Sequence, residues 1–112
     1  MKGVNSQMPT NEINELKDSF VVDLKPRKIY LFGSFAEGNQ NIDSDFDFYI
    51  IVDDSEKDVL ELTAKAYKSI RYKQKHSVDI IVNTEKTFED RKKRLLSVES
   101  EVAQKGVLLY GT

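Results

Sequence analysis

The chain lacks cysteine and tryptophan, and it has only two prolines and one histidine among its 112 residues. Without cysteine there is no disulfide framework and no thiol chemistry. No apolar stretch approaches the roughly 20 residues of a membrane span, and residues 1–11 lack the apolar core of a signal peptide. The net charge of −2 excludes a general basic surface for nucleic acid. We therefore expect a cytoplasmic protein with no membrane span and no general nucleic-acid binding.

The length sets the domain organisation that the sequence predicts. A chain of 112 residues suits one domain and buries about two thirds of its unfolded surface, which is enough for an independent core. We see no repeat and no low-complexity linker. The expectation is a single domain over residues 1–112, with residues 1–9 as a loose lead-in.

Apolar spacing predicts helices that alternate with strands. Four residues at helical spacing predict a first helix, capped at Thr10 and stopped by Pro26: Ile13, Leu16, Phe20 and Leu24. Strands are expected at about 27–33, 47–52 and 77–82. A capping-box pattern at 55–58 precedes a long helix marked by Val59, Leu62, Ala66 and Ile70. One further helix, capped within 87–90 and closed by Gly106, would carry Leu95, Val98 and Val102. This alternation predicts an α/β (α+β) fold, a sheet covered by helices.

A glycine-serine turn follows the first predicted strand. Gly33 lets the backbone approach a ligand closely, and Ser34 stands where a short helix can begin and face an anion. Gly38 then releases the chain into a loop. The pattern is neither a Walker A loop, which needs Gly-Lys-Ser/Thr, nor a dinucleotide fingerprint. An ordinary turn capped by Ser34 is the alternative, because a Gly-Ser pair alone is weak support for a phosphate site.

Two aspartates open the next strand. Side chains alternate along a strand, so Asp45 and Asp47 share one face, while the opposite face is predicted as core: Phe46, Phe48, Ile50 and Val52. Two close carboxylates repel each other unless a cation lies between them. Mg²⁺ is a suitable cation because it binds one or two carboxylates and leaves other positions for phosphates. A solvated turn is the alternative for these aspartates taken alone.

A third aspartate, Asp79, interrupts the apolar run 77–82. A buried charge is costly unless it is paired or binds a metal. If this strand lies beside that of Asp47, three carboxylates meet, a set that suits two divalent ions roughly 3.5–4 Å apart. The alternative places Asp79 at an exposed strand edge.

These residues together resemble the signature of the minimal nucleotidyltransferases of the DNA polymerase β superfamily. The matching residues are Gly33, Ser34, Gly38, Ser44, Asp45, Asp47 and Asp79. The resemblance implies a mixed sheet flanked by helices, with residues 101–110 forming the last helix and strand. It also implies catalysis and binding of two Mg²⁺ ions by Asp45, Asp47 and Asp79, and nucleotide binding by Gly33, Ser34, Gly38 and Ser44. Glu37 departs from the family, since many members carry arginine there.

Small stand-alone members of this family resemble the antitoxin of a toxin–antitoxin pair whose toxin is a helical HEPN-domain RNase. The resemblance implies transfer of AMP from ATP to a tyrosine of that toxin. Three alternatives stay open: an antitoxin that neutralises by docking alone, an enzyme acting on a small molecule, and a template-free nucleotide adder to RNA. The acidic balance disfavours the last of these.

Two basic segments invite a functional interpretation. Arg71, Lys73, Lys75 and His76 are expected near the end of the long helix, where cations suit the helix dipole. Residues 91–94 form a second basic run on the predicted last helix. We interpret both as solvated surfaces, and we give His76 no catalytic role.

Overall fold

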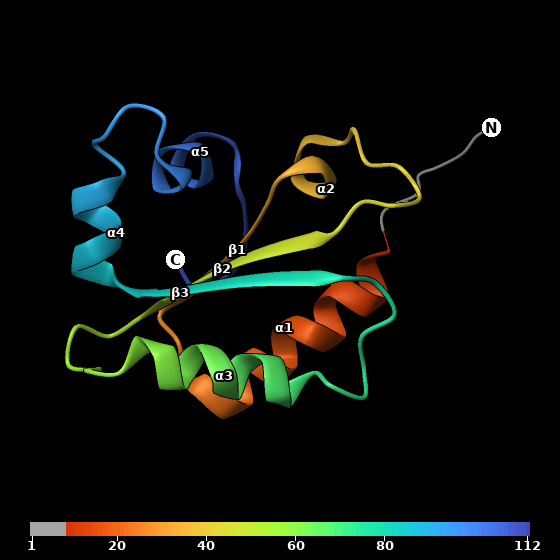
Figure 1. The fold of residues 1–112 in the computed structure, drawn as a ribbon, viewed down its shortest axis with the longest axis horizontal. Coiled ribbons are helices and arrows are strands. Elements are labelled where there is room, and N and C mark those ends of the chain that lie inside the picture. The colour runs from red at the N-terminus through yellow and green to blue at the C-terminus, as the bar shows by residue number, and fades with distance from the viewer. Residues whose placement is uncertain (1–8) are drawn as a thin grey trace.

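The computed structural model describes residues 9–112, which form one four-stranded mixed sheet with helices on both faces (Figure 1). Apart from Pro9, the expected lead-in lies outside the described residues. The elements in chain order are α1 (Thr10–Leu24), β1 (Lys28–Phe32), α2 (Ser34–Glu37), β2 (Phe46–Val52), α3 (Val59–Ser69), β3 (Val78–Thr84), α4 (Glu85–Arg91), α5 (Val98–Lys105) and β4 (Val107–Tyr110). This confirms the predicted α+β class.

The strands lie in the order β3-β2-β1-β4. The central strand β1 runs antiparallel to both β2 and β4, whereas β2 and β3 are parallel. A parallel pair needs a crossover connection, and α3 lies in it. As a result, the first residues of β2 and β3 lie at the same end of the sheet as the last residue of β1.

Helices α1 and α3 cover one face of the sheet (Figure 1). The four apolar residues predicted for α1 are all buried, and so is the predicted core face of β2: Phe46, Phe48, Ile50 and Val52. The rings of Phe20 and Phe48 meet edge-on, with centroids 5.1 Å apart. Spacing of 3.6 in the helix and 2 in the strand therefore predicted both buried faces correctly, and the structure shows that they pack on each other.

The opposite face is covered by α4 and α5. Tyr49 and Ile51 point there from β2, and they pack with Phe88 of α4 and Val102 of α5. Strand β2 is therefore buried on both faces over most of its length, which explains its unbroken apolar run. Asp47 lies on this second face, at the point where the apolar cover ends.

Two helix starts differ from prediction. Pro9 is the N-cap of α1, so Thr10 is the first helical residue. Asp58, the last residue of the expected capping box, is the N-cap of α3, and its carboxylate accepts from the N–H of Glu61 at 2.9 Å. The N–H of Ser55 donates to Asp53 in the preceding turn. The predicted capping box was therefore wrong, because its serine, Ser55, is part of the loop before α3 and does not cap the helix.

The single helix predicted after residue 87 is two helices. Thr84 caps α4 and Ser97 caps α5, each accepting a backbone N–H within the first turn. Between them the chain turns at Leu96, whose φ is 67°, and Leu95 is 89% exposed. The predicted stop at Gly106 is confirmed, because its N–H closes α5 on the carbonyl of Val102.

The first basic segment lies in the loop after α3, and its residues Arg71, Lys73 and Lys75 are exposed, as expected of a solvated surface. Helix α3 stops at Ser69, and the following loop is tied to α1. The buried carboxylate of Glu12 accepts from the N–H groups of Lys75 and His76, at 2.7 and 3.1 Å, and lies 2.7 Å from Nδ1 of His76. The His76 ring packs on Phe46, with centroids 4.6 Å apart. These contacts of Glu12 with Lys75 and His76 hold α1 against the start of β3, and we call them the clamp.

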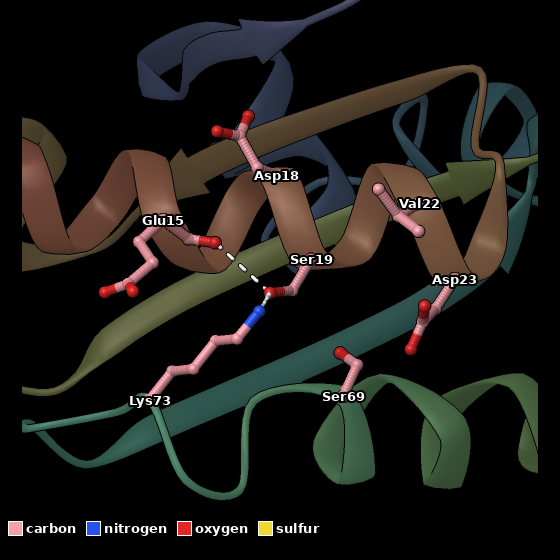
Figure 2. Close-up of a pocket in the computed structure, with 7 residues that line it drawn as sticks. All are labelled: Glu15, Asp18, Ser19, Val22, Asp23, Ser69 and Lys73. Atoms are coloured by element: carbon pink, nitrogen blue, oxygen red, sulfur yellow. Dashed lines mark hydrogen bonds between the residues drawn. The ribbon is translucent and has the colours of Figure 1, made fainter.

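Figure 2 shows a second contact of the same loop, in a pocket of about 240 Å³ between α1 and α3. Nζ of Lys73 donates to Oγ of Ser19 at 2.7 Å, and that hydroxyl lies 3.3 Å from the carbonyl of Glu15. None of the seven residues drawn belongs to the acidic set predicted from the sequence, which is Asp45, Asp47 and Asp79.

Within residues 9–112, no helix has the length and hydropathy of a membrane span.

Candidate functional site

Three strand ends meet at the predicted acidic set. Asp47 of β2 is paired in register with Asp79 of β3 on one side and with Phe32 of β1 on the other. Asp45 precedes β2 by one residue. The turn that follows Phe32 brings Gly33 to the same place. The topology thus assembles residues from two separate sequence motifs at one end of the sheet.

Asp47 is the electrostatic centre of this group. Burial is the largest of the causes that raise the pKa of its carboxyl to about 6; the charges of Asp79, Asp45 and Glu101 and a contact with the side chain of Asp79 supply the rest. A like charge nearby disfavours ionisation. The raised pKa therefore reports that the negative charges around Asp47 disfavour its ionised form, which favours a bound cation or proton.

The position of Asp79 corrects part of the sequence argument. It is the second residue of β3, not its middle, and it is exposed on a strand at the sheet edge. Burial cost therefore gives no reason to assign it a partner. Asp79 belongs to the acidic set because its register places it opposite Asp47. The structure therefore combines the two sequence-based interpretations: Asp79 lies at an exposed edge and is also paired with Asp47.

Gly33 connects the turn to the acidic set. Its φ of 78° and ψ of −155° belong to a region essentially restricted to glycine. A β-carbon at this position would overlap the carboxylate of Asp47. Ser34 begins α2, and Gly38 ends it with a φ of 77° and an N–H that bonds the carbonyl of Ser34. The glycine thus permits direct contact between the turn and the carboxylate.

Ser44, predicted to bind nucleotide, shapes the loop before Asp45. Its Oγ accepts from the N–H of Asn41 at 2.8 Å, and its own N–H donates to the carbonyl of Asn41 at 3.0 Å. These reciprocal bonds close the turn that leads into Asp45. Ser44 therefore lies in the loop that leads to Asp45 and to Asp47 in β2.

The donor set fits a hard divalent cation. Carboxylate oxygens are the ligands that Mg²⁺ prefers, and Asp47 and Asp79 are close enough to share a hydrogen bond. As the side chains stand, no group of three or more His, Cys, Asp or Glu within residues 9–112 has the arrangement of a metal site. The acidic set therefore fits the ion in the kind of ligand that it offers, through the pair Asp47 and Asp79, and Asp45 is not gathered with them in one ligand group.

A buried polar network holds α5 against β2. The hydroxyl of Tyr49 donates to Oε2 of Glu99 at 2.7 Å and accepts from the amide of Asn83 at 3.0 Å. Nη1 of Arg91 lies 4.0 Å from the same Glu99 carboxylate. Burial, and then the bond to Glu99, raises the pKa of Tyr49 well above its usual range. The network fixes the helix that brings Glu101 towards Asp47.

Sequence reasoning missed Glu99 and Glu101. Both look like surface glutamates in the first turn of a helix, where acidic residues suit the dipole. Glu99 is nevertheless 5% exposed, and Glu101 acts on Asp47. Only the packing of α5 on the sheet distinguishes them, and no local pattern in the sequence carries that information.

An ion pair joins α2 to the end of α5. Nζ of Lys105 lies 3.8 Å from Oε1 of Glu37. Both residues line a pocket of about 350 Å³, together with Leu95, Leu96, Ser97, Ser100, Glu101 and Gln104. Glu37, the residue that departs from the family pattern, is exposed and paired with this lysine.

Three solved structures resemble this chain. A toxin–antitoxin complex with AMP-PNP is 25% identical, over 93% of this chain and 74% of the other, with a TM-score of 0.54. A mutant of the toxin–antitoxin MntA–HpeT is 26% identical, with coverages of 95% and 75% and a TM-score of 0.52. A putative nucleotidyltransferase from Sulfolobus solfataricus, 24% identical over 94% and 78%, has a TM-score of 0.55 and shows the shared fold.

A comparison with curated proteins found no match. The family model described as a nucleotidyltransferase domain matches residues 13–107, a span that runs from α1 to the start of β4 and includes the whole acidic set. The residues that carry the signature thus lie within a match that covers most of the chain, and the chain belongs to the nucleotidyltransferase domain family.

Proposed function

We propose that this chain is a Mg²⁺-dependent nucleotidyltransferase that moves AMP from ATP onto a hydroxyl of a partner protein. We propose as partner a HEPN-type toxin, neutralised in the cytoplasm by a single domain spanning residues 1–112. The observation that carries the proposal is the Asp47–Asp79 pair next to the Gly33 turn. The similarity to a toxin–antitoxin complex with AMP-PNP supports both the nucleotide and the kind of partner.

The roles follow the chemistry of each group. Asp45 and Asp47 would hold one Mg²⁺, and with Asp79 they would hold a second. The ions supply neutralisation of phosphate charge and a lower pKa for the acceptor hydroxyl. The triphosphate would be held by the turn and loop residues Gly33, Ser34, Gly38 and Ser44, because glycine permits close approach and serine hydroxyls donate to phosphate oxygens.

The transfer is an in-line displacement. The acceptor oxygen forms a bond to the α-phosphorus, and the bond from that phosphorus to the bridging oxygen of the β-phosphate breaks. The hydroxyl proton would pass to a carboxylate, a role that we assign to Asp79, which is exposed, and pyrophosphate would leave. Positioning and charge neutralisation supply most of the rate enhancement in such reactions.

A docking-only antitoxin is the second candidate. Glu37 favours it, because an acidic side chain near the proposed phosphate site opposes an anionic substrate. A small-molecule acceptor and an RNA acceptor have no comparable structural observation in their favour.

The two candidates are separated by incubating the chain with ATP, Mg²⁺ and the product of the adjoining gene, followed by intact mass spectrometry. An AMP-sized adduct on the partner supports transfer. Tight binding without an adduct supports docking alone. Asp45→Asn and Asp47→Asn should abolish the adduct with little loss of fold, measured by circular dichroism. Full transfer in either variant would contradict the assignment.

Asp53→Asn is the matched control for these variants. Asp53 is an exposed aspartate just after the far end of β2, and it pairs with Arg27 at 3.2 Å. Its substitution removes the same charge from the same strand region without touching the acidic set. Transfer should therefore be unchanged.

A further inference from the structure

The proposed site is rich in negative charge for an enzyme that binds a polyanion. Asp45, Asp79 and Glu101 all act on Asp47, and Glu37 lines the same pocket as Glu101. Like charges oppose a triphosphate unless cations compensate for them. Bound divalent ions would offset part of this charge, so a basic side chain at the pocket has a clear use.

Lys105 is the lysine that the fold brings to this pocket. It is the last residue of α5, a position where a cation is favoured by the helix dipole. Its Nζ lies 3.8 Å from Oε1 of Glu37, and the two side chains are 60% and 32% exposed. A partly solvated pair of this kind contributes little to stability, so the ammonium group can exchange partners at low cost.

The strand register places Lys105 next to the glycine-serine turn. Leu31 of β1 is paired with Val107 of β4 in antiparallel register. Two residues after Leu31 the chain reaches Gly33, and two residues before Val107 it reaches Lys105. The N–H of Gly106 bonds the carbonyl of Val102 at 2.9 Å and holds the end of α5. The backbone of Lys105 is therefore fixed close to the proposed phosphate site.

We propose that Lys105 binds the phosphate tail of the nucleotide and that Glu37, its present partner, competes with phosphate for it. The inference rests on the proposed function and adds a phosphate ligand from α5. Lysine suits the role because its ammonium is a compact charge on a flexible stem. Phosphate carries more charge than one carboxylate, so an incoming triphosphate displaces Glu37.

The test is equilibrium binding of AMP-PNP with Mg²⁺, measured by isothermal titration calorimetry at low salt. Lys105→Met should weaken binding roughly three- to tenfold, whereas Lys105→Arg should keep most of the affinity. Glu37→Gln should tighten binding about two- to fivefold by releasing the lysine. Lys92→Met is the matched control, because Lys92 is the C-cap residue of α4 and pairs with Glu89 at 2.6 Å; the affinity of this variant for AMP-PNP should equal that of the wild-type chain.

The double variant Glu37→Gln/Lys105→Met decides how Glu37 acts. If Glu37 acts through Lys105, its substitution gives no gain once the lysine is gone. A gain that persists in the double variant would show direct repulsion and overturn the competition. Equal affinity of the wild-type chain and Lys105→Met would overturn the assignment of Lys105 and leave the proposed function standing. Failure of the wild-type chain to bind AMP-PNP would overturn both.

Discussion

Asp47 and Asp79 stand opposite each other in the parallel pair of β2 and β3, and the negative charge of Asp79 helps to raise the pKa of the Asp47 carboxyl. The pair occupies the start of both strands, next to the turn at Gly33. Because Asp47 is partly buried among other carboxyls, its ionised form is held at a cost to the folded state. This cost can be measured.

Replacing Asp47 with asparagine should stabilise the protein at neutral pH. Its pKa is raised to about 6 in the folded chain, so above pH 6 the folded state holds a charge that the unfolded state accommodates more easily. Protonation recovers the lost stability as the pH falls from above 6 towards the unfolded value of about 4. Urea unfolding at pH 8 should show Asp47→Asn more stable by about 1–2 kcal/mol, with no difference at pH 3.5. If Asp47→Asn were less stable than the wild-type chain at pH 8, the ionised Asp47 carboxylate would not destabilise the folded state.

Gly33→Ala should cost more stability than Gly38→Ala. Both glycines have positive φ, but a β-carbon at Gly38 meets no atom within 4 Å, whereas one at Gly33 overlaps Asp47. We expect a loss of about 1 kcal/mol for Gly38→Ala and about 2–4 kcal/mol for Gly33→Ala. Thermal unfolding measures both losses of stability. Equal losses would show that the Asp47 side chain moves away from the new β-carbon at little cost.

Tyr49→Phe should loosen α5 from the sheet. The change removes the hydroxyl that donates to the buried Glu99 carboxylate, and an unsatisfied buried acceptor costs about 1–3 kcal/mol. Hydrogen exchange should increase in α5 more than in α1. Tyr72→Phe is the control, since Tyr72 is 92% exposed and its change should stay within about 0.5 kcal/mol.

Glu12→Ala should release the loop that precedes β3. Two backbone N–H groups and the His76 ring lose their shared acceptor, and we expect a loss of about 2 kcal/mol. Limited trypsin digestion should then cut faster at Lys73 and Lys75. Glu15→Ala, at an exposed side chain on the same helix, should leave the digestion rate unchanged; similar rates for both variants would argue against the clamp.

Local patterns in the sequence predicted what depends on local geometry. Alternation along β2 separates Asp47 from the buried Phe48, and helical spacing gives the buried face of α1. The sequence offers both Ser55 and Asp58 as N-caps of α3. Asp58 is the N-cap because Ser55 belongs to the preceding turn, where its N–H donates to Asp53. Leu95 was placed in a helix because its apolar spacing continues across a break made by Ser97.

Relationships between distant elements were beyond the sequence. The parallel register of β2 and β3 unites Asp47 with Asp79, and periodicity does not encode strand order. Glu101 and Lys105 gain their positions from the packing of α5 on β1 and β2. The metal, the partner and the cellular location remain predictions, because they concern molecules and compartments outside the chain.

The crossover through α3 has a consequence for how this protein matures. The parallel pairing of β2 and β3 closes a long segment of chain that contains α3, and such long-range pairing is intrinsically slow to form. Until that pairing forms, Asp47 and Asp79 belong to separate strands and do not face each other. The pairing of β2 with β3 is thus the step of folding that creates the acidic pair.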